Sequence, residues 1–229
     1  MIRSKIKVKN VICRGVIFDF NGTLFWDTKL HNEAWRLFLD KYNIHISDEE
    51  MFQRIHGKNN RDIFVEIFHD TLPKELIPGM GLEKERIYQQ LCLQSGLELA
   101  PGATDFFDFL TAQGIAYTIA TASDKENVDF YFEHLGLEQW FEYDRVAYND
   151  GKITGKPTPD IYLKAMSAIG REPSEVIVFE DAVAGIHAAE NAHAGQIIIV
   201  DSNNDDYNCW DYQRIRNFDE VDRGLWQMG

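Results

Sequence analysis

Residues Gly15–Thr23 read GVIFDFNGT, an apolar run that ends in a carboxylate and a glycine-bearing turn. A continuous apolar run of this kind is typical of a strand that a parallel sheet buries on both faces. Burying the Asp19 carboxylate at the end of such a strand costs free energy unless a partner pairs with the charge. A divalent metal together with a phosphate would supply that partner; the alternative is an aspartate that only caps the turn.

Four further apolar runs resemble the first and are separated by helical segments. The predicted strands are Gly15–Asp19, Ala116–Thr121, Arg145–Tyr148, Val176–Glu180 and Gln196–Val200. The predicted helices are Ala103–Gln113, Asp124–Leu135, Pro159–Ile169 and Asp181–His193, each followed closely by a glycine. Strands that alternate with helices predict an α/β fold, a doubly wound parallel sheet of Rossmann type.

The alternation is interrupted after the first strand, where no good strand occurs and the pattern predicts several helices. Ser47–Glu50 is a capping box that opens one of them. Pro73 opens another, which Gly79 and Gly81 are expected to break. This insertion would lie over the carboxyl ends of the strands, where open α/β sheets bind ligands. We expect a core domain of residues 1–27 and 97–229 and an inserted helical cap domain of residues 28–96.

The chain has 229 residues and a formal net charge of −14, with a sequence pI near 4.9. This acidity excludes most nucleic-acid partners, because phosphate backbones require clustered Lys and Arg, and it disfavours an anionic membrane surface. No apolar run approaches the roughly 18 residues of a membrane helix. The start, MIRSKIKVKN, lacks the apolar stretch of a signal peptide, and the three cysteines have no metal-site or disulfide spacing. We expect a cytoplasmic protein that is a monomer or weak dimer.

A second group of carboxylates, Glu180 and Asp181, lies where a predicted strand passes into a helix, in the stretch Val178–Gly185, VFEDAVAG. Adjacent like charges repel, and a cation between them and Asp19 would relieve the repulsion. Oxygen ligands of this kind favour Mg²⁺. The alternative is that Asp181 only caps the helix.

Two more polar groups follow predicted strands. Lys156 precedes a loop that Pro157 and Pro159 restrict, so its ammonium would be held firmly enough to neutralise a phosphoryl group. The stretch Thr121-Ala122-Ser123 offers a hydroxyl and backbone N–H groups at a predicted helix N-terminus, which is an anion site. Taken singly, a surface lysine and a simple helix cap are the more ordinary interpretations.

Taken together, in this chain order, the four motifs resemble those of the haloacid dehalogenase (HAD) superfamily of phosphohydrolases, most closely its β-phosphoglucomutase-like branch. The family pattern D-x-D-G-T/V corresponds to Asp19–Thr23, and E-D-x-x-x-G corresponds to Glu180–Gly185. The resemblance covers nearly the whole chain, including the helical insertion. It implies a phosphoric monoester hydrolase that forms an aspartyl-phosphate intermediate and uses Mg²⁺.

The resemblance also implies roles for individual residues. Asp19 would be the nucleophile and would bind Mg²⁺ together with the backbone carbonyl of Asn21 and the Asp181 carboxylate. Glu180 would orient the metal site. Thr121 and Lys156 would bind and neutralise the transferring phosphoryl group. The predicted substrate-binding residues are Thr23, Ala122, Ser123, His31, Arg61 and Lys84.

Three of these residues come from the cap and carry weaker signals. His31 lies one helical turn from Trp35, in a stretch similar to the first cap helix of sugar-phosphate enzymes; the alternative is a core or hinge histidine. Arg61 follows His56 in a stretch that resembles the substrate loop, and it would clamp a second anionic group unless it is only a solvated arginine. Lys84 resembles a lysine at the matching position of β-phosphoglucomutase.

The chain departs from the family at Asn21, where the resemblance implies an aspartate that acts as general acid and base. An amide does not exchange a proton near neutral pH, and losing such help typically costs about 10²–10⁴ in rate. Three interpretations stay open. The chain is an engineered trap of an active enzyme, a natural variant that uses a good leaving group or another base such as His31 or His56, or a phosphate-binding protein of low activity.

We therefore predict a Mg²⁺-dependent HAD-type phosphatase that acts on a small phosphorylated metabolite, with sugar phosphates as candidates. A phosphosugar mutase of β-phosphoglucomutase type is an alternative, but it needs acid and base help in both half-reactions, so Asn21 weighs more against it. A low-activity binder of phosphorylated metabolites is the other alternative. Dehalogenase chemistry needs no Mg²⁺, so the Glu180–Asp181 pair argues against a dehalogenase. A phosphonatase needs a lysine in the cap, but the residues around Lys58 fit that branch of the family poorly.

Overall fold

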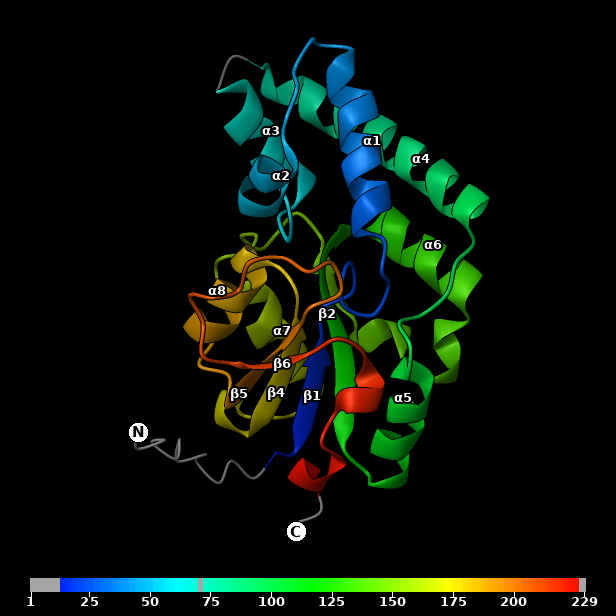
Figure 1. Ribbon diagram of the computed structural model, residues 1–229, viewed down its shortest axis with the longest axis vertical. Helices are drawn as coiled ribbons and strands as arrows, with labels where there is room; N and C mark the ends of the chain where they lie inside the picture. Colours follow the sequence, from blue (N-terminus) through cyan, green and yellow to red (C-terminus); the bar gives the residue numbers. More distant parts are fainter. Residues whose placement is uncertain (1–12, 70–71, 227–229) are drawn as a thin grey trace.

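Six parallel strands form one sheet in the order β3-β2-β1-β4-β5-β6, with helices on both of its faces (Figure 1). The computed structural model describes residues 13–69 and 72–226, so the start of the chain, expected not to be a signal peptide, lies outside the described residues. The predicted doubly wound α/β fold is confirmed. The strands are β1 (Gly15–Phe18), β2 (Ala116–Asp124), β3 (Ala147–Asn149), β4 (Val176–Glu180), β5 (Gln196–Val200) and β6 (Gln213–Ile215).

Strand β1 lies inside the sheet, between β2 and β4. Its side chains alternate between two apolar clusters, with Val16 and Phe18 in one and Ile17 in the other. Helices on the two faces complete these clusters, which is why the apolar run has no polar alternation. The core helices are α5 (Ala103–Ala112) and α6 (Lys125–Leu135) on the first face, and α7 (Asp160–Ala168) and α8 (Val183–Asn191) on the second.

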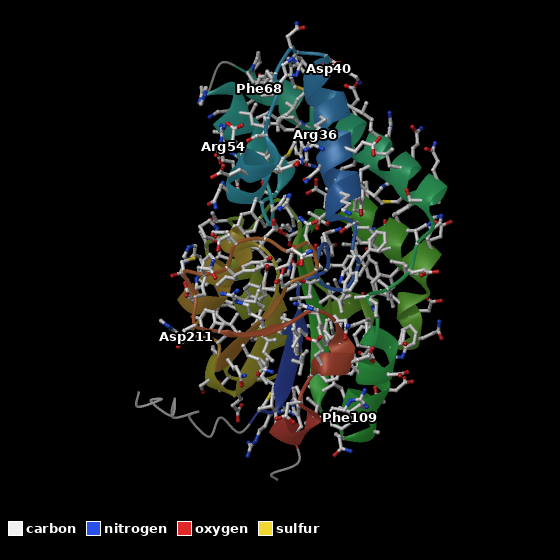
Figure 2. The ribbon with its side chains drawn as sticks, viewed as in Figure 1. Arg36, Asp40, Arg54, Phe68, Phe109 and Asp211 are labelled. Atoms are coloured by element: carbon white, nitrogen blue, oxygen red, sulfur yellow. The ribbon has the colours of Figure 1, made fainter. Side chains whose placement is uncertain are left out.

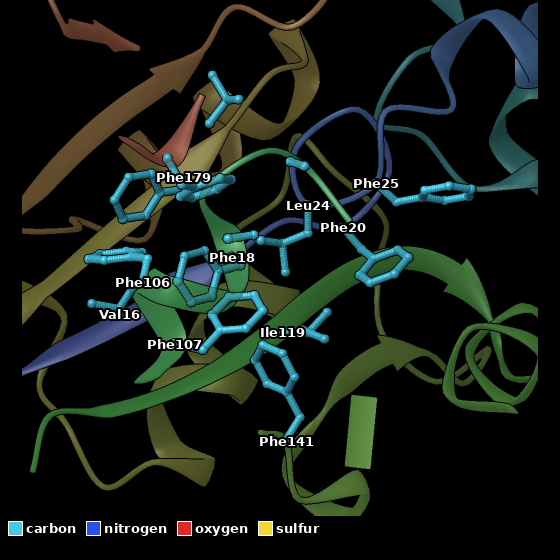
Figure 3. Close-up of a cluster of buried hydrophobic side chains, with 14 of the residues drawn as sticks. Val16, Phe18, Phe20, Leu24, Phe25, Phe106, Phe107, Ile119, Phe141 and Phe179 are labelled. Carbon is cyan, nitrogen blue, oxygen red and sulfur yellow. The ribbon is translucent and has the colours of Figure 1, made fainter. Parts of the chain in front are cut away.

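Phe18, the last residue of β1, is the centre of an aromatic cluster (Figure 3). Its ring lies 5.3 Å from that of Phe179 on β4, and 5.4 and 5.9 Å from those of Phe107 and Phe106 on α5. Aromatic pairs at such separations add about 0.5–1.5 kcal/mol beyond the burial of their area. The cluster therefore holds the end of β1, and with it the next residue, Asp19, against β4 and α5.

Four of the helices described between β1 and β2, all but α5, form a separate layer beyond the carboxyl end of β1 (Figure 1). They have an apolar core of their own, which includes Trp35, Phe38 and Phe64. This separate core supports the predicted division into core and cap domains, which stays a prediction. The cap helices are α1 (Thr28–Asp40), α2 (Asp48–Arg54), α3 (Asn60–Phe68) and α4 (Ile77–Ser95).

The cap carries charged side chains on its outside, among them Arg36, Asp40 and Arg54, which Figure 2 shows clear of the sheet. Arg54 donates to Glu66 on α3 at 3.0 Å, a contact that links α2 to α3. Such partly exposed ion pairs contribute little stability, about 0–1 kcal/mol each. The apolar core, rather than these pairs, therefore accounts for most of the packing among the cap helices.

Two expectations for the cap have different outcomes. The capping box at the start of α2 is confirmed, because Glu50 N donates to Ser47 Oγ at 3.3 Å and Ser47 N donates to Glu50 Oε2 at 3.0 Å. The predicted break at Gly79 and Gly81 is wrong, because α4 runs through both. A glycine inside a helix costs only about 1 kcal/mol relative to alanine. Gly81 also packs closely on α3, where an added Cβ would lie 3.7 Å from Asn60.

The last strand, β6, was not predicted from the sequence. Only Ile215 of its three residues is buried, so Gln213–Ile215 carries no apolar run, and pairing with β5 along the sheet edge defines the strand instead. The predicted core helices begin and end within about two residues of those observed, which is the usual uncertainty of helix boundaries. None of the described helices is long and apolar enough to span a membrane.

Replacing Phe18 with alanine is expected to lower the free energy of unfolding by about 3–5 kcal/mol, because the side chain is fully buried and its loss leaves a cavity. Urea denaturation followed by circular dichroism would measure the change. Leu93→Ala, on a side chain that is 54% exposed, is the control and should change the stability by less than about 0.5 kcal/mol. Equal effects of the two substitutions would contradict the packing described above.

Candidate active site

Four charged side chains that are distant in the sequence meet at the carboxyl ends of β1 and β4. Asp19 follows β1, Glu180 ends β4, Asp181 comes next, and Lys156 lies in the loop between β3 and α7. Each is at most 7% exposed. Neighbouring parallel strands end at the same edge of a sheet, so the topology itself gathers these residues.

Lys156 lies between two of the carboxylates. Its Nζ donates to Asp19 Oδ1 and to Glu180 Oε1, both at 2.5 Å. Glu180 also accepts from the Tyr162 hydroxyl at 2.9 Å and, through Oε2, from the backbone N–H of Ala182 at 2.7 Å. Both oxygens of Glu180 are therefore occupied, whereas Asp19 keeps Oδ2 without a hydrogen-bond partner within residues 13–69 and 72–226.

The three carboxylates could hold a metal ion, because one oxygen from each of Asp19, Glu180 and Asp181 lies within 4.8 Å of the others. With Lys156 as the neighbouring cation, three carboxylates and one ammonium leave an excess of two negative charges in a buried space. A divalent cation would balance that excess, and carboxylate oxygens suit a hard cation such as Mg²⁺. Three donors already contact Glu180, whereas Asp19 and Asp181 each accept one side-chain hydrogen bond, so Asp19 and Asp181 are the carboxylates better able to bind it directly.

The pKa values of the charged groups in the metal-free site reflect the same excess of negative charge. Burial raises the pKa of Asp19 to about 8, against the opposing effect of Lys156. Burial and the neighbouring Glu180 and Asp19 also raise the pKa of Asp181 well above its usual value. Burial would lower the pKa of Lys156, but Asp19 and Glu180 outweigh it and raise that pKa. The lysine therefore stays charged, and the aspartates would lose protons on binding a cation.

Two glycines of the sequence motifs are required by close approach to these carboxylates. A Cβ at Gly22, where φ is +80°, would lie 2.0 Å from Asp181 Oδ2, and one at Gly185 would lie 1.5 Å from Glu180 Oε1. Thr23, predicted to bind substrate, is buried and donates to Asp181 Oδ1 at 3.1 Å. It therefore supports the acidic cluster and is not among the residues that line the cavity.

The predicted anion site at Thr121-Ala122-Ser123 reaches the cavity, but it differs from the expected helix N-terminus. Strand β2 continues to Asp124, because after an irregularity it pairs again with Asn149 of β3, and α6 begins only at Lys125. Thr121 Oγ1 accepts from the backbone N–H of Ser123 at 3.1 Å. The hydroxyls therefore sit on an irregular strand end beside Asn21.

Asn21 is held by hydrogen bonds through both ends of its amide. Its Nδ2 donates to Asp27 Oδ2 at 2.6 Å and to the Tyr131 hydroxyl at 2.8 Å, while its Oδ1 accepts from Ser123 Oγ at 2.8 Å. The amide supplies a donor where a carboxylate would face Asp27. Asn21 thus fits its surroundings as an amide, and it offers no exchangeable proton.

Asp27 is a site residue whose role was not predicted from the sequence. It is fully buried ahead of α1, where Oδ1 accepts from the backbone N–H of Gly22 at 3.0 Å and Oδ2 accepts from the Tyr88 hydroxyl. Burial alone would raise the pKa of Asp27, but His31, Tyr88 and Asn21 together lower it. The signal available in the sequence was the spacing of Asp27 and His31, one helical turn apart.

The cap residues His31 and Lys84 meet at the same place. His31 Nε2 lies 3.3 Å from Asp27 Oδ2, and Lys84 Nζ lies 2.9 Å from His31 Nδ1. The His31 ring stacks on Tyr88 with 3.8 Å between centroids. Lys84 is 1% exposed and lies 5.0 Å from the centre of the Trp35 ring, so it is adjacent to both His31 and Trp35.

One cavity joins the core and cap groups. Its lining includes Asp19, Asn21, Thr121 and Asp181 from the core and His31, Trp35, His56, Lys58, Asn60, Lys84 and Glu85 from the cap. His56 is kept neutral near pH 7, since burial and the neighbouring His31 lower its pKa to about 4.

Arg61 lies outside this cavity. It is exposed on α3, whereas its neighbour Asn60 faces the cavity and donates to Glu85 at 2.7 Å. Successive residues of an α-helix point about 100° apart, so only one of the two can face inward. The predicted clamp on a second anionic group is therefore not brought to the site. Lys58 does reach the cavity, but it is paired with Glu66 at 2.7 Å.

Comparison with known proteins agrees with the resemblance that the sequence motifs indicate. The family model of haloacid dehalogenase-like hydrolases matches residues 13–193. A phosphorylated carbohydrates phosphatase of Thermotoga maritima is 30% identical over 196 residues, which cover 83% of this chain and 87% of that protein. A β-phosphoglucomutase of Mycobacterium bovis is 24% identical over 225 residues, covering 87% of this chain and 84% of the mutase.

A solved structure is also similar over nearly its whole length. The HAD hydrolase of family IA, variant 3, from Entamoeba histolytica has a TM-score of 0.83 and 33% sequence identity, covering 93% of this chain and 98% of that one. The matched family residues include every charged group gathered at the ends of β1 and β4. This chain therefore belongs to the haloacid dehalogenase-like hydrolase family.

Proposed function

We propose that the protein is a Mg²⁺-dependent phosphatase that hydrolyses a small phosphorylated metabolite through an aspartyl phosphate on Asp19. The observation that carries the proposal is that Asp19 and Asp181 line a cavity that cap residues also line, while the buried Lys156 pairs with Asp19. The protein's net charge of −14 would repel an anionic substrate, so attraction must be local. Lys156 and a bound divalent cation would provide it.

In the proposed reaction, Asp19 attacks the phosphorus through Oδ2, which is free of protein partners in the described part of the chain, while Lys156 holds Oδ1 at 2.5 Å. The bond to the leaving alcohol breaks as the bond to Asp19 forms, and water then hydrolyses the aspartyl phosphate. Thr121 and Ala122 line the cavity and would hold the phosphoryl oxygens. Mg²⁺, held by Asp19, Asp181 and the Asn21 carbonyl, would neutralise negative charge on that group.

A monophosphate substrate fits this cavity better than a bisphosphate. A mutase must hold a second phosphate, but Arg61 is exposed outside the cavity and Lys58 is paired with Glu66. Lys84 is likewise beside Glu85 at 3.1 Å. Hydroxyl-bearing substrates suit the remaining polar lining, and the similarity to a phosphorylated carbohydrates phosphatase supports sugar phosphates as candidates.

The metal should stabilise the fold in a pH-dependent way. The folded chain binds the Asp19 proton more tightly than the unfolded chain does, so without metal this contribution to stability is lost as the pH rises from about 4 to about 8. Mg²⁺ must displace that proton and binds more tightly at the higher pH. We expect saturating Mg²⁺ to raise the Tm by about 5–10 °C near pH 8 and by less near pH 6.

Scanning calorimetry in Mg²⁺ and in EDTA would measure this shift. Asp181→Asn is the matched variant, since it removes one charged ligand and keeps the size of the side chain. It should abolish most of the Mg²⁺-dependent rise. A rise of the same size in this variant, or one that does not change with pH, would count against the proposed metal site.

Turnover should depend on both Asp19 and Mg²⁺. We expect the chain to release phosphate from some members of a panel of phosphate monoesters, with sugar and polyol monophosphates the most reactive. Asp19→Asn should lower turnover by at least about 10⁴-fold because it removes the nucleophile, as in other enzymes that lose a nucleophilic residue. Phosphate release measured with and without Mg²⁺ would show this.

The same panel with Asn21→Asp distinguishes the alternatives. An aspartate there would face Asp27 across the 2.6 Å now spanned by a hydrogen bond, so one carboxyl would stay protonated and could act as an acid. No turnover by either chain would refute the phosphatase. Turnover by Asn21→Asp alone would favour a binder of phosphorylated ligands, and conversion between two phosphate positions would favour a mutase.

A further inference from the structure

Asp124 is a carboxylate of the cavity wall that has no role in the proposed reaction. It is the last residue of β2 and lines the cavity together with residues of the cap. Resting on the proposed function, we propose that Asp124 selects the substrate by charge. It favours esters whose alcohol part presents an ammonium or hydroxyl donor, and it disfavours esters that carry a second anionic group.

Asp124 differs from the other carboxylates of the cavity in having no basic partner. Three of the others each contact a basic side chain: Asp19 contacts Lys156 at 2.5 Å, Glu85 contacts Lys84 at 3.1 Å and Asp27 contacts His31 at 3.3 Å. Asp181 is a proposed ligand of the divalent cation. Within residues 13–69 and 72–226, no Lys, Arg or His forms an ion pair with Asp124. Its charge is therefore available to a group on the substrate.

The groups around Asp124 do not neutralise its charge. Asn149 of β3 donates to Asp124 Oδ1 at 2.5 Å, and Asn60 of the cap is a second, uncharged hydrogen-bonding neighbour. Burial and the negative charge of Glu85 raise the pKa of Asp124 to about 6, against the opposing effect of the two amides. Asp124 is still mostly ionised at pH 7 and above. A partly buried carboxylate without a counter-ion costs free energy, which a donor on the substrate would recover.

The two lysines that line the cavity are already paired with carboxylates. Lys58 donates to Glu66 at 2.7 Å, and Lys84 donates to Glu85 at 3.1 Å. A second anionic group on the substrate would therefore face the Asp124 carboxylate without gaining an unpaired cation from the described residues of the wall. Like charges at close range repel, so such a substrate would bind less well than a neutral or cationic one.

Asp124 is close enough to the proposed phosphoryl site to contact the alcohol part of a small ester. It follows Thr121 by three residues on β2, and Thr121 would hold a phosphoryl oxygen. An extended chain spans at most about 3.6 Å per residue, so the two Cα atoms are at most about 11 Å apart. The side chains, the phosphoryl group and an alcohol of a few carbons together cover that distance.

The test compares three esters of the same length that differ in the charge of the alcohol part. Serinol phosphate carries an ammonium group, glycerol 3-phosphate carries only hydroxyls, and 3-phosphoglycerate carries a carboxylate. We expect the unmodified chain to hydrolyse the first two with a higher kcat/KM than the third.

Asp124→Asn removes the charge, keeps the size of the side chain and can still accept from Asn149. The ratio of kcat/KM for serinol phosphate to that for 3-phosphoglycerate should fall by about 10–100-fold, the range expected for a hydrogen bond to a charged group. The value for glycerol 3-phosphate should change much less, because an amide can also accept from a hydroxyl.

The matched control is Glu126→Gln, which removes the same charge from an exposed residue two positions later, outside the cavity lining. Solvent screens its charge, so the ratio should change by less than about threefold. If Asp124 had only a structural role, Asp124→Asn would lower all three values by similar factors, and that result would overturn the inference.

Hydrolysis of p-nitrophenyl phosphate by the unmodified chain tests the proposed function separately. If this ester is hydrolysed, an unchanged ratio in Asp124→Asn, or no turnover of the three-carbon esters, would overturn the inference alone. If none of the four esters is hydrolysed, the proposed function and this inference fail together.

Discussion

The contact between Lys156 and two buried carboxylates is the interaction on which the site depends. The ammonium joins Asp19 at the end of β1 to Glu180 at the end of β4, with both contacts at 2.5 Å. Removing one partner of such a buried group typically costs about 3–5 kcal/mol, because an unpaired charge remains in the interior. The lysine also leaves Asp19, the proposed nucleophile, with one oxygen free of protein partners in the described part of the chain. Its own charge is too small to balance three carboxylates, and a divalent cation would make up this deficit.

A second polar network begins at Asn21 and extends into the cap. It passes through Asp27 to His31 and Lys84, so the core strand end and the cap helices share one set of hydrogen bonds. Glu85 and Asn127 add a direct contact between cap and core at 2.7 Å. A substrate that binds between core and cap would therefore contact residues that hydrogen bonds already connect. The amide of Asn21 fits this network because its Nδ2 donates a hydrogen bond to the Asp27 carboxylate.

The fold was largely predictable from local sequence, and the site in part. The apolar runs identify five of the six described strands, each of which buries apolar side chains. The motifs place Asp19 and Asp181 directly after strands, whereas Thr121 lies within β2 and Lys156 lies in the loop between β3 and α7. Local signals failed where tertiary contacts decide. Strand β6 exists through pairing with β5, α4 runs through two glycines while its Ile77 and Met80 pack in the cap core, and Arg61 turns outward because Asn60 occupies the inward face.

The sequence by itself determined the order of strands and helices, the acidic and basic residues that follow the strands, and the presence of an amide at position 21. These depend on hydrophobic burial and on residue type, which are properties of a residue and its near neighbours. Only the tertiary structure decided that Asn21 donates to Asp27, that Asp27 lies beside His31, and that His31 meets Lys84 from a helix 53 residues later in the chain. Hydrogen-bond partners are set by the approach of distant segments to within about 3 Å, and no local pattern encodes that approach.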